Sequence, residues 1–275
     1  MSADPFVIVG AGHAARRTAE ALRARDPDVR IVMIGAEREL PYDRPALSKD
    51  ALLGDGGEQR AFVRDAGWYD AQRIALRLGT RVDAIERDAQ RVRLDDGSSL
   101  PYARLVLATG SRVRPFAGPV DDGVALHYVR TVADARALRA QLAPGRRVAV
   151  LGGGFIGLEV AAAARQLGCD VTVIDPAARL LQRALPEVVG TYARQLHDGR
   201  GVAFRLATTP SAAQRAAARS STRTPATCSA MWWSSASASC RTSNSRMRPG
   251  STSTTAYAST PAAARPIPRS SRPAR

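Results

Sequence analysis

Short apolar runs of strand length alternate with longer amphipathic stretches over about the first 208 residues. The apolar runs lie at Phe6–Val9, Val29–Ile34, Leu105–Ala108, Val148–Leu151 and Val171–Ile174. The helical segments between them are rich in Ala, Leu and Arg and lie at Ala14–Arg25, Val132–Leu142 and Ile156–Leu167. Alternation of this kind predicts an α/β protein with a parallel sheet and crossover helices. The polar break Asp95–Ser98 predicts a hairpin turn.

The pattern changes abruptly at Thr209. From there to Arg275 the chain consists mostly of Ser, Thr, Ala, Pro and Arg, and it contains no Val, Leu or Phe. Such a segment cannot bury enough apolar surface to offset the entropy lost on ordering. The first interpretation is therefore a disordered basic tail over residues 209–275.

A second interpretation is a change of reading frame between about Phe204 and Gln214. Met and Trp have one codon each, so Met231-Trp232-Trp233 must be written ATG-TGG-TGG. Read one base upstream, these codons contain GTG-GTG, and a TCN codon for Ser234 adds a third valine codon. The shifted reading is compatible with D-V-V-V-V-G-I-G-I-V-P-N here, and with T-S-D-P-A-I-F-A-A-G within Ala264–Ala274. We favour this interpretation and assign the tail no functional role.

The distribution of charged residues changes at the same position in the chain. The chain has 275 residues, with 40 basic and 25 acidic side chains and a formal net charge of +15. No acidic residue follows Asp198, and residues 209–275 contain ten arginines, so the first 208 residues carry only +5. Nucleic-acid binding would therefore rest on the composition of the tail alone, and we expect none.

Other composition signals narrow the class of protein. Three cysteines (Cys169, Cys228 and Cys240) are too few for a disulfide scaffold, and no CxxC pair suggests zinc. The N-terminus shows neither the basic region nor the cleavage site of a signal peptide. No uninterrupted apolar stretch reaches about 18 residues. We expect a soluble cytoplasmic protein without a membrane segment or a bound metal.

Two glycine-rich turns directly follow predicted strands. The first reads Gly10-Ala-Gly12-His-Ala-Ala15, and the second reads Gly152-Gly-Gly154-Phe-Ile-Gly157. In a dinucleotide site the first glycine permits the tight turn, the second lets the backbone approach a pyrophosphate, and the helix N-terminus supplies free N–H groups. A single turn of this kind also occurs as a tight connection in doubly wound sheets that bind no dinucleotide. Two such turns in one chain indicate dinucleotide binding far more specifically.

A carboxylate lies about 20 residues beyond each turn, at or just after the end of the next predicted strand. These carboxylates are Glu37 and Asp175, and each is placed to accept a hydrogen bond from a ribose hydroxyl. A carboxylate also repels a 2′-phosphate, so Asp175 favours NADH over NADPH. Arg179 lies nearby and could hold such a phosphate, which keeps NADPH as the less favoured alternative.

The motifs together resemble a known family. Leu105–Ser111 is another strand ending in an Ala-Thr-Gly turn, and with both fingerprints it resembles the flavoproteins that bind FAD first and NAD(P)H second. Within these flavoproteins, three segments are similar to the ferredoxin reductase branch of the FAD-dependent pyridine nucleotide-disulfide oxidoreductases. That branch includes putidaredoxin reductase and the reductases of aromatic-ring dioxygenases. The segments are LPYDRPALSK at Leu40–Lys49, YVRT at Tyr128–Thr131 and GGGFIGLE at Gly152–Glu159.

The resemblance implies a fold and a domain order. It covers about the first 205 residues in frame, and the shifted reading extends it. The implied fold is two Rossmann-like domains, an FAD domain with an inserted NAD(P)H domain, whose C-terminal part is missing. We divide the chain into a first FAD-binding segment (1–112), an incomplete NAD(P)H-binding domain (113–208) and the out-of-frame tail (209–275).

The resemblance also implies roles for individual residues. Lys49 would lie close to the flavin ring and pair with Glu159, which makes these two the candidate catalytic residues. The implied FAD contacts are Gly10, Gly12, Ala15, Glu37, Lys49, Val82, Ala108, Thr109, Gly110 and Arg130. The implied NADH contacts are Gly152, Gly154, Phe155, Ile156, Gly157, Glu159 and Asp175. A solvated Lys49, a surface Glu159 and a packing Phe155 remain the plainer alternatives, and His13 is given no role.

The absence of a cysteine pair decides where electrons would go. Disulfide reductases with the same two sites need a redox pair shortly after the first fingerprint, and Pro41–Lys49 contains no cysteine. By resemblance the external acceptor would be a ferredoxin-like [2Fe-2S] protein, which makes the chain an FAD-dependent NADH oxidoreductase. The alternatives are a truncated dinucleotide-binding fragment without activity, a rubredoxin reductase, and a component of an NADH nitrite reductase.

Overall fold

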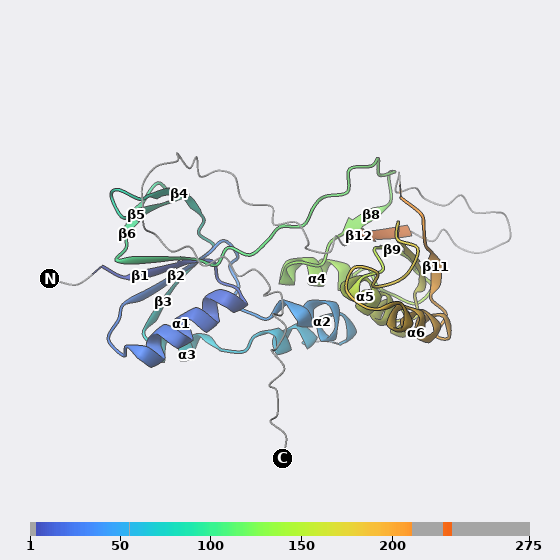
Figure 1. Cartoon of the computed structure of the whole chain (residues 1–275), viewed down its shortest axis with the longest axis horizontal. Helices are drawn as coiled ribbons and strands as arrows, with labels where there is room; N and C mark the ends of the chain where they lie inside the picture. The colour runs from blue at the N-terminus through green and yellow to red at the C-terminus, as the bar shows by residue number, and fades with distance from the viewer. Residues whose placement is uncertain (1–3, 55, 211–227, 233–275) are drawn as a thin grey trace, which may run out of the picture.

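The computed structural model describes residues 4–54, 56–210 and 228–232, the last of these by its backbone alone. Figure 1 shows two lobes side by side, each with its own sheet. The first lobe contains β1 to β7 with α1 and α3, and the second contains β8 to β12 with α4, α5 and α6. Short helices between α1 and β3 lie beneath the second lobe, where α2 packs against α4 and α5.

The first lobe is built on a parallel sheet with strand order β3-β2-β1-β7. Helix α1 covers one face, where Ala15 and Ala19 pack on Ile8 and Met33. A separate antiparallel sheet, β4-β5-β6, covers the opposite face. The elements are β1 (Phe6–Val9), α1 (His13–Arg25), β2 (Ile31–Gly35), α3 (Ala66–Ala71), β3 (Ile74–Leu78), β4 (Val82–Glu86), β5 (Arg91–Leu94), β6 (Ser99–Pro101) and β7 (Arg104–Leu107).

One edge of the first sheet is open. Among the described residues β7 pairs only with β1, so the other side of the strand has no partner strand. Leu107 at its end is 59 % exposed, which is high for a leucine in a sheet strand. The second sheet has one more strand beyond the equivalent position.

The second lobe is built on a parallel sheet with order β11-β10-β9-β12-β8. Helix α5 packs on it through Val160, Ala161 and Ala164, which lie against the strand residues Val148 and Val171 in the largest buried cluster. The elements are β8 (Ala125–His127), α4 (Val132–Arg139), β9 (Arg147–Leu151), α5 (Phe155–Gln166), β10 (Asp170–Ile174), α6 (Glu187–Asp198), β11 (Ala203–Arg205) and β12 (Cys228–Trp232).

Strand β12 lies within the segment that we expected to be disordered. It pairs in parallel with β9 on one side and β8 on the other, so it completes the hydrogen bonding of both strands. Without it, the facing backbone groups of β8 and β9 would lack partners, which is costly in a sheet interior. The shifted reading places a run of valines from Trp232 onward, where β12 ends. The rest of the tail prediction lies outside the described residues.

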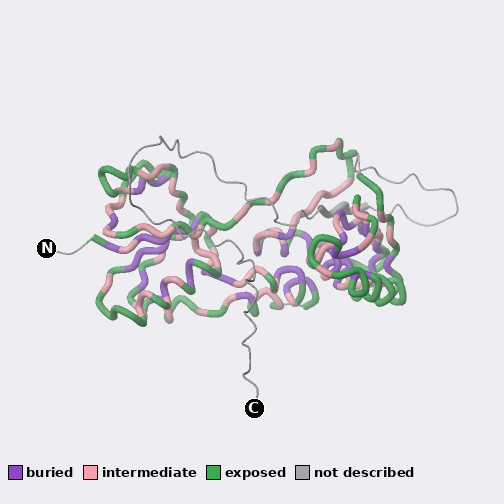
Figure 2. The backbone as a smooth tube through the Cα atoms, viewed as in Figure 1, coloured by how far each residue is buried: buried purple, intermediate pink, exposed green. Residues whose placement is uncertain are grey.

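Part of the connection between β2 and β3 is buried together with the second lobe. The connection between β2 and β3 carries two 3₁₀ turns, η1 (Arg44–Ser48) and η2 (Gly57–Ala61), and helix α2 (Asp50–Leu53). Tyr42, Leu47 and Leu52 from this connection are buried in one cluster with Val150 and Val160 of the second lobe. Figure 2 shows the corresponding buried segments beneath the second lobe. The two lobes therefore share a hydrophobic core along this connection.

The predicted α/β class is confirmed, with both sheets parallel at the two glycine-rich turns. Each of the predicted strands and helices is present, with ends that differ by at most three residues. The predicted hairpin turn joins β5 to β6, and Gly97 adopts a φ of +82° there. The short strands of the antiparallel sheet and the 3₁₀ turns were not predicted, because their apolar positions are too few to show a period. Helix α6 was missed although Val188, Tyr192 and Leu196 recur at helical spacing.

Candidate functional site

The first glycine-rich turn is shaped so that only glycine fits at its first position. Gly10 has a φ of +121°, and a Cβ there would lie 2.1 Å from the carbonyl oxygen of Ala108. Gly12 is the N-cap of α1, with no side-chain capping bond and nothing within 4 Å of a Cβ. No acidic residue lies in the first turn of α1. The helix therefore presents free N–H groups and its positive end to an open space, as an anionic phosphate requires.

The second turn repeats this geometry. Gly152 has a φ of +121°, and Gly154 is the uncapped first residue before α5, again with open space around it. A Cβ on Gly157 would lie 1.9 Å from the carbonyl oxygen of Gly152, so α5 can approach its turn only with glycine at this position. In the first turn Ala15 stands at the corresponding place and is fully buried. Both turns fit a dinucleotide pyrophosphate.

The two predicted ribose carboxylates already have protein partners. Glu37 accepts a hydrogen bond of 2.5 Å from the hydroxyl of Tyr42 and one of 2.7 Å from the guanidinium of Arg44. Asp175 accepts from the backbone N–H of Gly153 at 2.5 Å and from that of Ala177 at 2.6 Å. Asp175 contacts its glycine-rich turn through Gly153, and both carboxylates hold the surrounding loops. Contact with a ribose stays a prediction.

Two arginines lie together beside the first turn. Arg44 donates a hydrogen bond to the carbonyl of Arg130 and stacks 5.2 Å above the ring of Tyr42. Burial, reinforced by the positive charge of Arg44, lowers the pKa of Arg130. The Nη2 atom of Arg130 lies 3.3 Å from where a Cβ of Gly110 would be, and its buried Nε has no hydrogen-bond partner. This pair of guanidinium groups makes the neighbourhood strongly attractive to an anion.

Tyr42 connects this cluster to the second lobe. Its hydroxyl donates to Glu37 and accepts from the backbone N–H of Val132, at the start of α4. Burial and the hydrogen bond to Glu37 raise the pKa of Tyr42 well above its usual range. The phenol therefore stays protonated and serves as a fixed link between β2 and α4.

A cleft of about 260 Å³ lies where η1 meets the start of α5. Its walls include Lys49, Arg130, Phe155, Ile156 and Glu159. The ammonium of Lys49 lies 2.9 Å from Oε1 of Glu159, which brings the two candidate catalytic residues together from the connection between β2 and β3 and from α5. Phe155 is 53 % exposed and is therefore not a packing residue of the described core.

The remaining residues predicted to contact FAD lie beside the first turn or in the cluster between the two sheets of the first lobe. The carbonyl of Ala108 faces Gly10, and Thr109 and Gly110 continue the chain directly from there. Val82 begins β4 and packs into the buried cluster between the first sheet and the antiparallel sheet. It supports the site from below the sheet, and no described contact brings it to the cleft.

Sequence reasoning did not assign three residues that the structure brings to the site. They are Tyr42, Arg44 and Ser48, all inside the segment LPYDRPALSK that carried the resemblance. Ser48 donates a hydrogen bond of 2.5 Å to Oε2 of Glu159. Polar side chains within an otherwise buried turn were the available signal, but their direction cannot be read without the backbone.

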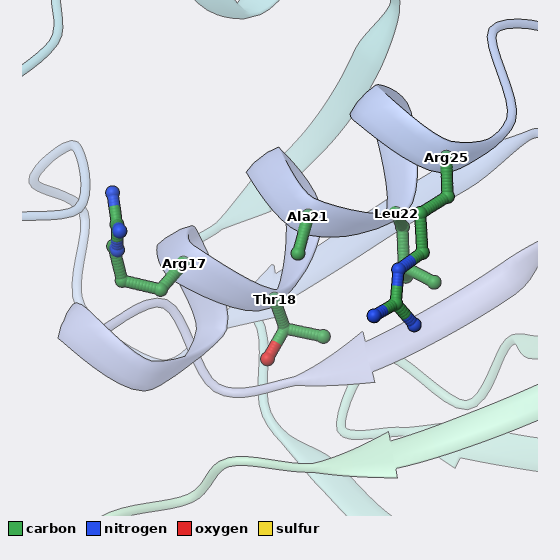
Figure 3. A pocket seen from close by; sticks show the side chains of 5 residues that line it. All are labelled: Arg17, Thr18, Ala21, Leu22 and Arg25. Atoms are coloured by element: carbon green, nitrogen blue, oxygen red, sulfur yellow. The ribbon is translucent and has the colours of Figure 1, made fainter.

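A second hollow, of about 340 Å³, runs along the outer face of α1 and is larger than the cleft. Figure 3 shows its lining side chains on that one helix. They are Arg17, Thr18, Ala21, Leu22 and Arg25. Its described lining comes from this one helix, whereas the smaller cleft brings together residues of several elements, so we assign the chemistry to the smaller cleft.

The described residues contain neither a dithiol nor a metal cluster. Cys169 is buried there, and its thiol donates to the carbonyl of Ala143 at 3.3 Å. Burial raises the pKa of that thiol, which makes it a poor nucleophile. No group of three or more potential metal ligands occurs in this part of the chain. None of the helices in the described ranges has the length and apolar character needed to cross a bilayer.

Comparison with known proteins places these features in a family. Over 217 residues the chain is 86 % identical to the ferredoxin–NAD(+) reductase component of an anthranilate 1,2-dioxygenase system from Burkholderia cepacia. That match covers 79 % of this chain and 53 % of the relative. Over 208 residues it is 42 % identical to a putidaredoxin reductase from Pseudomonas putida, covering 74 % of this chain and 49 % of the relative.

The fold matches solved structures of the same kind. A covalent putidaredoxin reductase–putidaredoxin complex superposes with a TM-score of 0.76 at 37 % identity, covering 84 % of this chain and 58 % of that one. The chain thus spans about half the length of the curated relatives it matches. Residues 4–228 match the family described as pyridine nucleotide-disulphide oxidoreductase. This match, over most of the chain, shows that the chain belongs to the pyridine nucleotide-disulphide oxidoreductase family, and the two glycine-rich turns and the Lys49–Glu159 pair agree with it.

Proposed function

We propose that the chain provides the dinucleotide-binding part of an FAD-dependent oxidoreductase that passes electrons from NADH to a ferredoxin-like [2Fe-2S] protein. The observation that carries the proposal is the cleft where η1 meets the start of α5. It holds the Lys49–Glu159 pair at 2.9 Å, with Lys49 from the connection between β2 and β3 and Glu159 from α5. The cleft lies at the start of the helix that follows the second glycine-rich turn, and Arg130, beside Gly110, lines it, so a nicotinamide and a flavin could meet there.

The residues of the first turn would hold FAD. The backbone N–H groups at the start of α1 would bind its pyrophosphate, and the guanidinium groups of Arg44 and Arg130 would balance the negative charge. Bound FAD would supply hydride acceptance from NADH and the release of single electrons. The ammonium of Lys49 would then lie beside the flavin and stabilise negative charge that develops on it.

The second turn would hold NADH. The N–H groups at the start of α5 would bind its pyrophosphate, and Phe155 would shield the cleft from water. Glu159 orients Lys49, so the protein contributes position and electrostatics rather than a nucleophile.

The surroundings of Asp175 support NADH over NADPH. Both carboxylate oxygens of Asp175 are held by backbone N–H groups, which fixes a negative charge at the end of β10. Arg179 donates to the backbone carbonyls of Leu185 and Gln182, so its guanidinium is already engaged in its own loop. A 2′-phosphate would therefore meet a fixed negative charge, with the nearby arginine committed elsewhere.

The described thiols and the relatives both bear on the identity of the electron acceptor. The buried Cys169 cannot serve as an internal electron acceptor. Two relatives are named as reductases of ferredoxin-type proteins, and one solved neighbour is a complex with putidaredoxin. An external iron–sulfur protein is therefore the acceptor we propose, and a cytoplasmic location goes with it.

An anaerobic titration tests the proposal. The purified chain is incubated with FAD, freed of excess cofactor and mixed with NADH in a stopped-flow instrument. We expect a yellow protein whose flavin absorbance bleaches on the addition of NADH, and oxidised [2Fe-2S] ferredoxin should restore the colour. A protein that binds FAD without bleaching would overturn the proposed reaction.

A second candidate is a dinucleotide-binding fragment without activity. Within the described residues, the side of β7 that has no partner strand favours it. The same titration separates the two candidates, because a fragment would retain little or no FAD.

A further inference from the structure

Ser48 is buried to an extent that is unusual for a polar side chain. It is 1 % exposed and, with Arg16, is one of two buried polar or charged residues in the described part of the chain. A buried hydroxyl is costly unless it has a hydrogen-bond partner. The partner of Ser48 is the carboxylate of Glu159, at 2.5 Å from Oγ to Oε2.

One carboxylate is thus shared by two consecutive residues. Oε2 of Glu159 accepts from Ser48, and Oε1 pairs with the ammonium of Lys49. The backbone at Lys49, with φ −118° and ψ −107°, is neither helical nor extended, because η1 ends there and α2 begins. This break lets two neighbouring side chains approach the same group.

The packing around Ser48 excludes water. Leu47 and Leu52 lie in the same buried cluster as Val160, so η1 and α2 are pressed against the helix that carries Glu159. Ser48 donates to Glu159 on the buried side of the carboxylate. Lys49 pairs with the solvent-facing side, and the side chain of Lys49 is 49 % exposed. A hydrogen bond to a charged group is strongest where water does not compete.

We propose that Ser48 is a positioning residue for the reaction. It fixes Oε2 of Glu159 so that Oε1 faces the cleft and holds the ammonium of Lys49 there. The inference rests on the proposed function, in which Lys49 stabilises charge on the flavin. Without the hydroxyl, the carboxylate turns toward solvent and Lys49 loses its fixed position.

The chain offers a direct probe, because Lys49 is its only lysine. Protein labelled with ε-¹³C-lysine gives one side-chain NMR signal, and no cofactor is needed to observe it. We expect Ser48→Ala to move this signal toward its position in Glu159→Gln. The matched control is Ser98→Ala, which removes a hydroxyl that also donates to a carboxylate, at Asp96 in an exposed turn. The control signal should superpose on that of the wild type.

Superposition of the Ser48→Ala signal on the wild type would overturn the proposal, as would an equal movement in the control. A loss of packing alone would not move the signal toward that of Glu159→Gln. Because this readout uses the chain without FAD, it stands even if the proposed function fails.

A kinetic readout follows in the FAD-loaded chain. Ser48→Ala should lower the limiting rate of flavin reduction about tenfold while the NADH concentration at half-saturation stays unchanged. The reverse split, with a weaker NADH affinity and an unchanged limiting rate, would show that Ser48 serves binding and would overturn its positioning role.

Discussion

Gly10 and Gly152 have the same backbone conformation, with φ +121° at the first position of each glycine-rich turn. The two residues lie in different lobes and follow different strands, yet each turns the chain directly into an uncapped helix. A conformation at this φ is accessible to glycine and is strained for every other residue. The same backbone geometry is therefore built twice in one chain, which is what two pyrophosphate sites would require.

Two glycines of the second turn should respond differently to the same substitution. Gly157→Ala places a Cβ 1.9 Å from the carbonyl oxygen of Gly152, so the helix must shift, and we expect a loss of about 1–3 kcal/mol in unfolding free energy. Gly154→Ala has open space and should cost well under about 1 kcal/mol. Its methyl group instead occupies the space of the pyrophosphate, so NADH affinity should fall. Urea unfolding and NADH titration of both variants check the contrast, which fails if both lose stability equally.

The ion pair across the cleft should set the rate of flavin reduction. Lys49→Met removes the only ammonium near the cleft, and Glu159→Gln removes the charge that orients it. We expect each to slow reduction by NADH by about ten- to a hundredfold with FAD content unchanged. Glu58→Gln is the matched control, because Glu58 pairs with Arg136 on the surface of α4. Unchanged stopped-flow rates in the first two variants would remove the role assigned to this pair.

The cofactor preference should depend on Asp175 and not on Arg179. Asp175→Asn removes the negative charge at the end of β10 while keeping a side chain of the same size, so use of NADPH relative to NADH should rise about tenfold. Arg179→Ala should leave this ratio unchanged, because its guanidinium is bonded to the carbonyls of Leu185 and Gln182. Reduction rates with both cofactors give the ratio. A large change in the Arg179 variant would show that this arginine reads the 2′ position.

Acid should weaken the first lobe through Asp43. Burial alone would raise the pKa of Asp43, but hydrogen bonds from His13 and Arg16 outweigh it and lower the pKa. A carboxyl with a lowered folded pKa contributes stability above about pH 4, and this contribution is lost as the pH falls through the folded value.

The Asp43→Asn variant should therefore lose on the order of 1 kcal/mol at pH 7 and depend less on pH below about pH 4. Asp122→Asn, at an exposed position, is the control. Thermal unfolding at several pH values measures the difference. Parallel pH profiles for wild type and Asp43→Asn would show that the carboxylate contributes nothing.

The elements around both turns could be predicted because their signals are local. A strand, two glycines and a helix with a small residue at its first buried position leave few alternatives at Gly10–Ala15 and Gly152–Gly157. The meeting of Lys49 with Glu159 came only from the resemblance, since no periodicity relates η1 to α5. Ser48, Tyr42 and Arg44 escaped prediction for the same reason, because their contacts depend on packing between lobes.

The burial of the connection between β2 and β3 against the second lobe was the least predictable feature. The sequence does not reveal that Leu47 and Leu52 are buried with the second lobe. These leucines read as part of a polar loop with few apolar positions. Their partners lie about a hundred positions further along the chain, so the shared core becomes visible only in three dimensions.

Among the described residues the side of β7 that faces away from β1 has no partner strand, which also bears on how the chain behaves in concentrated solution. Within that part of the chain, the N–H and C=O groups on this side, together with the exposed Leu107, form a template to which any extended segment can add by main-chain hydrogen bonds. Self-association of this kind needs no specific sequence in the added strand. We therefore expect the solubility limit of the chain to be set at this edge, with light scattering that rises with protein concentration and falls when Leu107 is replaced by Lys.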